Sequence, residues 1–289
     1  MKQARPMTSI LALALAATLA TGCVVKKEES GTSEFDINLA ATGQGLIGLL
    51  GDVSTNAGTT FSSKAVSAIS QRQTHTTISG QCEINQGTVT LDANDADNNH
   101  VMSIGDTFKV TFNQCVIKDS AGLETLNGEI NATATAVDST THEVTAADIH
   151  LNLTNVGLAF TADLTYQLLQ QASFRIELKP GTVANVGLGS RVFPVTAFTS
   201  AYGVPRLTGS IPGYQIQISL TATDPMYGTL AVALDSLTQL NGGTSQTDVT
   251  ANGSTVRITS AGNGNVTLRG TSGEQTVNAQ VLIDAIKNR

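Results

Sequence analysis

The stretch from Ala147 to Leu168 reads ADIHLNLTNVGLAFTADLTYQL and decides the fold class of this protein. Apolar and polar residues alternate through almost all of it. Strict alternation with a period of two indicates antiparallel strands with one buried face and one solvated face. We therefore predict a mainly β chain from residue 74 onward, with strands continuing to the C-terminus. The same alternation recurs at residues 172–178, 214–220, 266–268 and 277–283.

Turn signals separate the expected strands. Asn-Gly and Pro-Gly pairs favour tight turns, because Gly and Asn tolerate positive φ and Pro presets φ near −65°. About a dozen strands joined in this way form a large antiparallel meander, and so large a meander has to curl. The sequence leaves open a curled sheet or half-barrel, a closed barrel and a two-sheet sandwich. The signals lie at Asn127-Gly128, Pro180-Gly181, Pro212-Gly213, Asn241-Gly242-Gly243, Asn252-Gly253 and Gly262-Asn263-Gly264.

A segment before these strands has a helical period instead. Leu46, Leu49, Leu50 and Val53 are spaced as on one face of a helix, and an apolar residue recurs every four positions at 61, 65 and 69. Glycines at five positions between 43 and 58 weaken the pattern, because each costs up to about 1 kcal/mol against Ala inside a helix. We predict one or two short helices within residues 37–73, packed on the core of a single β-rich domain over 37–289.

The first 22 residues have the pattern of an export signal. Lys2 and Arg5 precede an apolar run that ends at Ala20 and is shorter than the roughly 20 residues of a membrane-spanning helix. The following residues, Leu19-Ala20-Thr21-Gly22-Cys23, resemble a bacterial lipobox, although the motif more often has Leu in place of Ala20. The resemblance implies cleavage after residue 22, attachment of diacylglycerol and palmitate-type acyl chains at Cys23, and a polar tether over 23–36. An ordinary secretory signal that contains a cysteine is the alternative.

The charge of the processed chain restricts its partners. Removing Lys2 and Arg5 from the 16 basic residues leaves 14 against 23 acidic ones, a net charge of −9. This balance argues against a nucleic-acid partner and against electrostatic binding to anionic lipid. The acyl chains at Cys23 would then attach the protein to the membrane. Val24 stands where Asp retains lipoproteins of enteric-type bacteria in the inner membrane, so the resemblance implies the cell envelope and favours the outer membrane.

The most specific local motif is DADNNHVMSIGD, from Asp95 to Asp106. It matches positions 1, 3, 5, 7, 9 and 12 of a calcium loop of the EF-hand type, whose oxygen ligands surround one ion. His100 stands where such loops have Gly, and Asp106 replaces the bidentate Glu. The flanks alternate like strands, so we expect a structural calcium site at a hairpin tip, or an Asn/Asp-rich turn that needs no metal. The predicted ligands are Asp95, Asp97, Asn99, the carbonyl of Val101, Ser103 and Asp106.

Two cysteines remain once Cys23 is assigned to lipidation. An even count in an oxidising compartment favours a disulfide between Cys82 and Cys115. If Thr88 pairs with Lys109 in the same hairpin, the register also places the two cysteines opposite each other on one face. The closed loop of about 34 residues would stabilise the fold by roughly 3–4 kcal/mol. Two free thiols or a metal-binding pair are the alternatives.

Catalytic motifs are missing from the sequence. It has no G-x-S-x-G elbow, no glycine-rich phosphate loop and no H-E-x-x-H, and its four histidines have no metal-ligand spacing. Aromatic residues make up 4% of the chain, without any Trp, which argues against a carbohydrate-stacking groove. We predict a protein that is not an enzyme and requires no cofactor.

A partial family resemblance covers Cys82 to Gly128, under a fifth of the chain. It consists of a Cys, a strand, an Asp/Asn loop ending in Gly-Asp, a strand reaching Asn-Gln-Cys, and then Leu-Asn-Gly. This order resembles uncharacterised β-rich lipoproteins of proteobacteria and implies no activity. Two functions stay open. The first is a lipid-anchored envelope component with a structural or binding role toward an envelope protein. The second is a half-barrel carrier of a lipid or other hydrophobic ligand.

Overall fold

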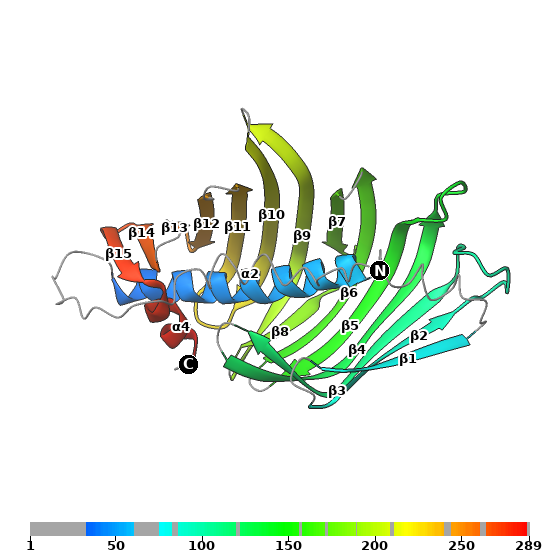
Figure 1. The fold of residues 1–289 in the computed structure, drawn as a ribbon. Helices are drawn as coiled ribbons and strands as arrows, with labels where there is room; N and C mark the ends of the chain where they lie inside the picture. The colour runs from blue at the N-terminus through cyan, green and yellow to red at the C-terminus, as the bar shows by residue number, and fades with distance from the viewer. Residues whose placement is uncertain are drawn as a thin grey trace.

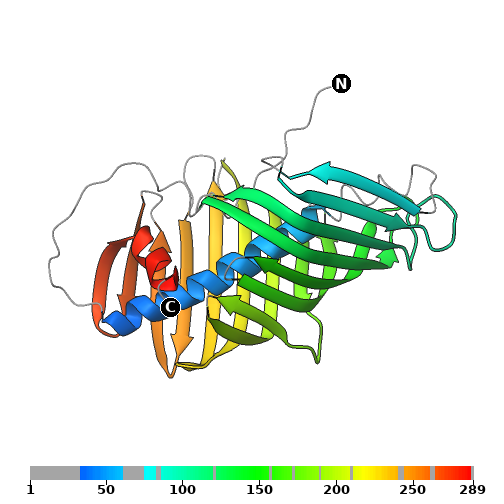
Figure 2. The same ribbon diagram turned by 90° about the horizontal axis from the view of Figure 1, so that it is seen from below.

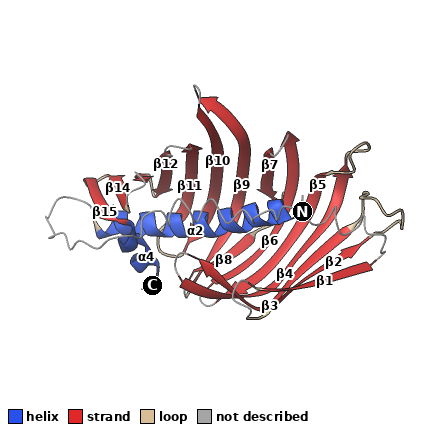
Figure 3. Cartoon of the chain, in the orientation of Figure 1, coloured by secondary structure: helices blue, strands red, loops and turns tan. Residues whose placement is uncertain are grey.

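A computed structural model describes most of the chain after residue 32. Within its described ranges the protein is mainly β, as predicted, with one antiparallel sheet and the two helices α2 (Glu34–Thr60) and α4 (Ala279–Lys287) (Figures 1 and 3). The export signal, Cys23, and the apolar positions 61, 65 and 69 lie outside the described residues. The described ranges are 33–60, 75–82, 86–119, 122–155, 158–170, 173–188, 190–208, 211–239, 244–260 and 264–287.

The strands follow one another across the sheet almost in chain order. The path runs from β1 to β7 and then from β9 to β15, while β8 lies beside it between β6 and β9. The strands are β1 (His75–Gln81), β2 (Thr88–Asn94), β3 (Thr107–Asp119), β4 (Gly122–Val137), β5 (Val144–Asn155), β6 (Leu158–Gln170), β7 (Ser173–Leu178), β8 (Ala184–Leu188), β9 (Arg191–Thr208), β10 (Ile211–Asp224), β11 (Gly228–Gln239), β12 (Thr244–Ala251), β13 (Ser254–Ser260), β14 (Asn265–Gly270) and β15 (Gly273–Asn278).

The sheet curls into a trough, which is the curled-sheet form of the predicted meander. Helix α2 lies along the inner face of this trough, with α4 beside it (Figure 1). Seen from below, α2 starts at the β14–β15 end and runs towards β6 (Figure 2). Among the described strands, β1 and β15 each pair with a single neighbour, so they form the two ends of the sheet.

The predicted alternation of buried and solvated residues is confirmed along the strands. Cross-strand partners place the inward residues in continuous rows, and one such row crosses nine strands from β5 to β14. No member of that row is more than 7% exposed, whereas neighbours of opposite parity, such as Arg175, Gln217 and Asp235, are exposed. The row consists of Ala147, Tyr166, Ile176, Ser200, Ile218, Leu234, Thr247, Ile258 and Leu268.

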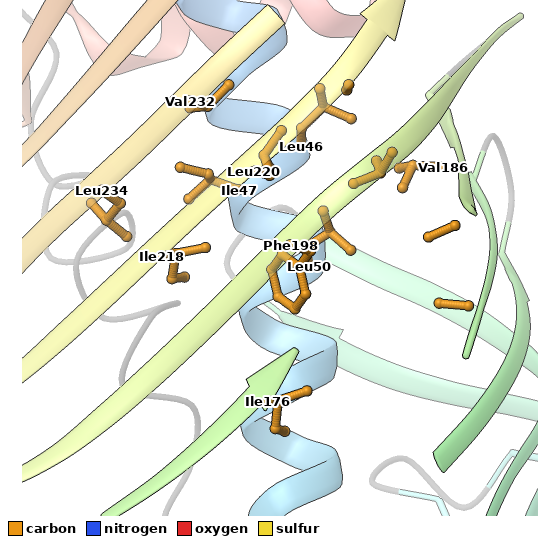
Figure 4. Packing of buried hydrophobic residues seen from close by; sticks show 14 of the residues in the cluster. Leu46, Ile47, Leu50, Ile176, Val186, Phe198, Ile218, Leu220, Val232 and Leu234 are labelled. Carbon is orange, nitrogen blue, oxygen red and sulfur yellow. The ribbon is translucent and has the colours of Figure 1, made fainter. Parts of the chain in front are cut away.

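Helix α2 supplies the apolar face that covers these rows. Ser33 caps the start of the helix, because its Oγ accepts the backbone N–H of Asp36 at 3.2 Å. The acidic residues of the first turn also interact favourably with the positive end of the helix dipole. The helix therefore begins at Glu34, inside the segment expected to be tether. Leu46 and Leu50 are fully buried, as the helical spacing predicts, and face strand residues such as Ile218 (Figure 4).

Gly43 allows α2 to lie directly on β12. A Cβ at this position would be 2.4 Å from Val249 Cγ2, so only a residue without a side chain fits without displacement. The glycines that weaken the helix in the sequence do not interrupt it in the structure. Burial of the apolar face against the sheet outweighs the propensity cost, as expected for helices whose stability comes mainly from packing.

The C-terminus differs from the prediction, because the last nine described residues form α4 and not a strand. The N–H of Gln280 donates to Asn278 Oδ1 at 2.9 Å, which caps the helix where β15 ends. Ala279 and Leu282 are buried three residues apart, the spacing of one helix face, and α4 packs on α2. The short apolar run from 277 to 283 fits both the strand period of two and the helical period of 3.6. The cap formed by Asn278 favours the helix.

The predicted turns have mixed outcomes. Asn252-Gly253 forms the expected hairpin turn, with φ values of 50° and 77°. Pro180-Gly181 forms a turn but does not reverse the chain, because β7 and β8 both run antiparallel to β6, end to end. Asn127-Gly128 and Pro212-Gly213 lie inside β4 and β10, so these two turn predictions were wrong. Residues 241–243 and 262–263 lie outside the described residues.

A bulge explains why Asn127 does not turn the chain. The β3–β4 register shifts between Phe112 and Cys115, and Gln114 adopts a φ of 49°. The backbone N–H of Gln114 donates to Asn127 Oδ1 at 2.8 Å. The side chain of Asn127 is therefore bound to the neighbouring strand, where it satisfies a donor that the bulge removes from the ladder.

A pair of glycine substitutions tests the packing of α2. We expect Gly43→Ala to destabilise the fold by about 1–3 kcal/mol, because the new Cβ overlaps Val249. Gly48→Ala is the matched control, since no atom lies within 4 Å of its added Cβ, and it should stabilise the helix by up to about 1 kcal/mol. Urea unfolding midpoints measure both effects. Equal stabilisation by the two substitutions would contradict the close contact between α2 and β12.

Candidate functional site

The Asp95–Asp106 loop connects β2 to β3, as the sequence predicts for a hairpin tip. The ladder between these strands ends at the pair Asn94–Thr107, so the loop lies beyond the β2–β3 ladder. Its last two residues are bonded to β4: the N–H of Gly105 donates to the carbonyl of Ala134, and the carbonyl of Asp106 accepts the N–H of Ala134, each at 2.9 Å. Asp95 is 4% exposed and Asp106 is fully buried, although both are carboxylates. Buried carboxylates need compensating donors, and the loop supplies them from its own backbone.

Backbone N–H groups surround the two buried carboxylates. His100 N–H donates to Asp95 Oδ2 at 2.7 Å, and Asn99 N–H donates to Oδ1 of the same group at 3.2 Å. Asp106 receives the N–H of Ala96 on Oδ1 and the N–H of Ser103 on Oδ2, each at 2.8 Å. The two side chains thus hold both halves of the loop together.

These contacts also set the charge state of Asp95. Burial opposes ionisation of this carboxyl, but hydrogen bonds from the backbone of His100, from the side chain of Asp97 and from the backbone of Asn99 stabilise the anion. Together they hold the pKa of Asp95 below its ordinary value. The loop therefore favours the ionised form of Asp95, the form that a cation would require.

The turn itself is made by residues in the left-handed conformation. Asn98 has a φ of 58° and His100 a φ of 65°. His100 occupies the position where calcium loops of this type have Gly, and it adopts the backbone geometry that Gly usually supplies. The departure noted in the sequence therefore does not prevent the sharp turn, although a non-glycine residue is strained there.

Three of the six predicted calcium ligands are brought together. The carboxylates of Asp95, Asp97 and Asp106 each offer an oxygen within 4.8 Å of the others, a spacing that ligands about 2.3–2.6 Å from one ion can have. The side chains of Asn99 and Ser103 instead bind within the loop. Asn99 Oδ1 accepts the N–H of Val101 at 2.8 Å, and Ser103 Oγ donates to Asp106 Oδ2 at 3.3 Å. Calcium binding stays a prediction, and the metal-free turn accounts for the same contacts.

Met102 fastens the loop to the core of the domain. It is 2% exposed and belongs to the same buried cluster as Phe108 and Ala93, at the ends of the two flanking strands. Its neighbour Ile104 is 68% exposed. The loop is thus anchored by one apolar side chain and two carboxylates, so its geometry depends on the sheet beneath it.

The predicted disulfide between Cys82 and Cys115 is present, with a Cα–Cα distance of 5.4 Å. The predicted register was wrong, however, because Thr88 pairs with Asn113 and Lys109 pairs with Asp92. The difference arises at the Asp95–Asp106 loop, whose twelve residues form internal hydrogen bonds and do not enter the β2–β3 ladder. Thr88 therefore pairs with Asn113, four residues farther along β3 than the predicted partner Lys109.

A different path brings the two cysteines together. Cys82 directly follows β1, a strand that pairs with β2 and not with β3. Gln86, two residues before β2, lies beside the bulge of β3, where the N–H of Val116 donates to its carbonyl at 3.0 Å. Gly87 is required there, since a Cβ would lie 2.0 Å from the carbonyl oxygen of Gln114. The disulfide thus ties the first hairpin to the third strand.

No protein-family model, curated protein or solved structure matches this chain. Any function therefore has to be argued from the residues and the fold.

Two polar features escaped the sequence analysis. Asp224, 1% exposed, accepts the N–H of Met226 at 2.6 Å and lies 3.5 Å from Arg191 Nη1, whose guanidinium also covers the ring of Phe193. His150 Nδ1 lies 2.7 Å from Asp163 Oδ1 on the outer face. Only the Asp-Pro turn at 224–225 gave a local signal for the first, and the second depends on the β5–β6 register.

The outer face also contains a hollow of about 370 Å³ with a mixed polar and apolar lining. The lining includes small residues such as Ala201, Ser219 and Ala233 together with longer polar side chains. Arg175 stands on one side and Asp235 on the other, each contributed by a different strand. The alternation in the sequence predicts that these side chains face outward, but their grouping follows from the cross-strand register.

A calcium titration tests the loop. If the three carboxylates bind calcium with a dissociation constant of about 10⁻⁴–10⁻³ M, 2 mM calcium should stabilise the fold by about 1–2 kcal/mol and raise Tm by a few degrees. Asp97→Ala should abolish the rise. Asp138→Ala is the matched control, because Asp138 shapes another turn through Thr140 and Thr141. The metal prediction fails if the wild-type Tm does not move with calcium.

Proposed function

We propose that this protein is a lipid-anchored, non-enzymatic component of the cell envelope with a structural or binding role. The lipobox-like residues before Cys23 support the anchor, and the outer membrane is the favoured location. Within the described residues, no helix combines the length and apolar character needed to cross a membrane. The disulfide between Cys82 and Cys115 is consistent with the oxidising compartment that this address implies.

The filled inner face is the observation that favours this role over a lipid carrier. A carrier of the half-barrel type needs an apolar cavity in the trough. Phe160, Leu164, Phe174 and Ile218, which would line such a cavity, are at most 6% exposed. Helix α2 packs against strands β7 to β14 on this side, so the chain uses most of its trough as its own core.

The outer face supports a role in contact with other proteins. It presents alternating charged and neutral polar side chains, many of them held in cross-strand pairs. Arg257 binds both oxygens of Asp248, at 2.8 and 3.0 Å, and its guanidinium holds the pKa of Asp248 below the ordinary value. Such exposed pairs add little stability, but they fix the pattern of charge that a partner would meet.

Replacement of the expected acylation site tests the anchor. We expect Cys23→Ser, made in the full chain and expressed in a bacterium that processes lipoproteins, to abolish palmitate incorporation and to release the protein from the outer-membrane fraction. The physical reason is that the processed chain has a net charge of −9, which disfavours electrostatic attachment to anionic lipid in place of the acyl chains. Radiolabelled palmitate and membrane fractionation measure the two effects.

Cys115→Ser serves as the control, because it removes a cysteine without touching the expected lipobox. It should keep both the label and the membrane location. Labelling that survives Cys23→Ser would contradict the proposed anchor. Native mass spectrometry of the same preparation distinguishes the carrier, since a stoichiometric non-covalent lipid would show that the trough holds a ligand.

A further inference from the structure

A row of outward-facing side chains with opposite charges at its two sides crosses β7, β9, β10 and β11, which are neighbours in the sheet (Figure 1). Arg175 of β7 pairs with Ala201 of β9. Gln217 of β10 pairs with Ala201 on one side and with Asp235 of β11 on the other. Directly opposite residues of antiparallel strands lie on the same face, so the row lies on the outer face throughout. A strand spacing of about 4.8 Å places the Cα atoms of Arg175 and Asp235 about 14 Å apart.

The hollow on the outer face lies along this row. Arg175, Gln217 and Asp235 belong to its lining, and Ser219 and Ala233 join them from the adjacent outward row. The short side chains of Ser219 and Ala233, beside the longer ones of the row, are consistent with a depression in the surface. Ligand pockets are usually about 300–1,000 Å³, so a hollow of about 370 Å³ suits a small ligand.

The two charged groups of the row keep their charge toward the hollow. Arg175 Nε lies 3.8 Å from Glu177 Oε1, which is longer than a hydrogen bond and leaves the guanidinium able to donate to a ligand. Asp235 Oδ1 accepts a hydrogen bond from the side-chain amide of Gln215 at 3.1 Å, and this neutral partner does not compensate the negative charge. The hollow is thus positive on the β7 side and negative on the β11 side.

Asp248 also lines the hollow, but its charge is already compensated. Arg257 donates to both of its oxygens, at 2.8 and 3.0 Å, and Gln246 donates to Oδ2 at 3.3 Å. Within the described lining, Asp235 is therefore the carboxylate that has no cationic partner.

Gln217 supplies a third feature between the two charges. Its side chain is exposed, and its amide makes no hydrogen bond within the described part of the chain. A primary amide offers both donors and an acceptor, the combination that a peptide group requires. A ligand that matches the row therefore has a carboxylate at one end, an ammonium group at the other and a peptide group between them.

We propose that this hollow binds a short peptide with free termini, about three residues long, because an extended chain of that length spans about 10 Å and the two charged side chains reach toward it from both sides. The C-terminal carboxylate would contact Arg175, whose planar guanidinium matches a carboxylate with two parallel hydrogen bonds. The N-terminal ammonium group would contact Asp235. A peptide group between them would exchange hydrogen bonds with Gln217.

The inference rests on the binding role proposed above and gives that role a class of ligand. It does not depend on the anchor at Cys23, because the hollow is formed by side chains of β7 and β9 to β12 alone. The two ideas can therefore fail separately.

An NMR titration with trialanine tests the site. The full chain carrying Cys23→Ser, which removes the acyl anchor, is isotopically labelled and titrated with the peptide. We expect saturable shifts centred on the amides of Ala201, Ser219 and Ala233. Acetylation of the peptide's N-terminus or amidation of its C-terminus should each weaken binding by about fivefold, the upper range for one exposed charge contact. An aminoalkanoic acid of the same length, which has no peptide group, should also bind more weakly.

Three substitutions assign each part of the ligand to one side chain. Arg175→Gln should bind the free and the amidated peptide equally, and Asp235→Asn should bind the free and the acetylated peptide equally. Gln217→Met should remove the preference for trialanine over the aminoalkanoic acid. Arg269→Gln, which changes an exposed arginine of β14 outside the hollow, is the matched control and should keep all three preferences.

Two results would overturn the proposal. The first is the lack of a saturable shift at the amides of the hollow. The second is a peptide blocked at both ends that binds as tightly as the free peptide, or preferences for free termini that survive in Arg175→Gln and Asp235→Asn. Palmitate incorporation at Cys23 is measured independently, so failure of the peptide site leaves the proposed anchor standing.

Discussion

The packing of α2 against the inner face of the sheet is the interaction on which the rest of the structure depends. A sheet that curls this strongly leaves a trough of apolar side chains, and a trough without a filling would expose them to water. Leu39, Leu46 and Leu50 fill it and are themselves fully buried. At Gly43, α2 approaches Val249 of β12 closely, and the helix as a whole packs on strands β7 to β14. The same packing fills the trough along these strands.

Much of the fold could be predicted because its signals are local. Alternation with a period of two fixed the faces of the strands, and the helical spacing of Leu46 and Leu50 fixed the face of α2. Two elements depended on side-chain hydrogen bonds that compete with these patterns. Asn278 caps α4 and ends β15, and Asn127 binds a bulge in β3 and does not turn the chain. A pattern of apolar residues alone cannot distinguish these two outcomes of an Asn side chain.

The candidate site shows where sequence reasoning fails for a different reason. The motif from Asp95 to Asp106 correctly placed three carboxylates around one point, since their spacing is set by a single loop. The cysteine pairing was also right, although it was argued from a register that the structure does not have. Cys82 and Cys115 meet beside the bulge at Gln114, where Gln86 and Gly87 also contact β3, and a bulge has no period that a sequence would reveal. The contact between Arg191 and Asp224 is equally non-local.

Hydrogen–deuterium exchange of the α2 amides tests the central claim most directly. The helix contains five glycines and would be unstable alone, so its protection must come from the sheet. We predict that amides between Leu39 and Leu50 exchange as slowly as those in the centre of β9 and β10, because both open only when the domain unfolds. Exchange of α2 orders of magnitude faster than that of these strands would contradict the account, since it would show that the trough keeps its shape without the helix.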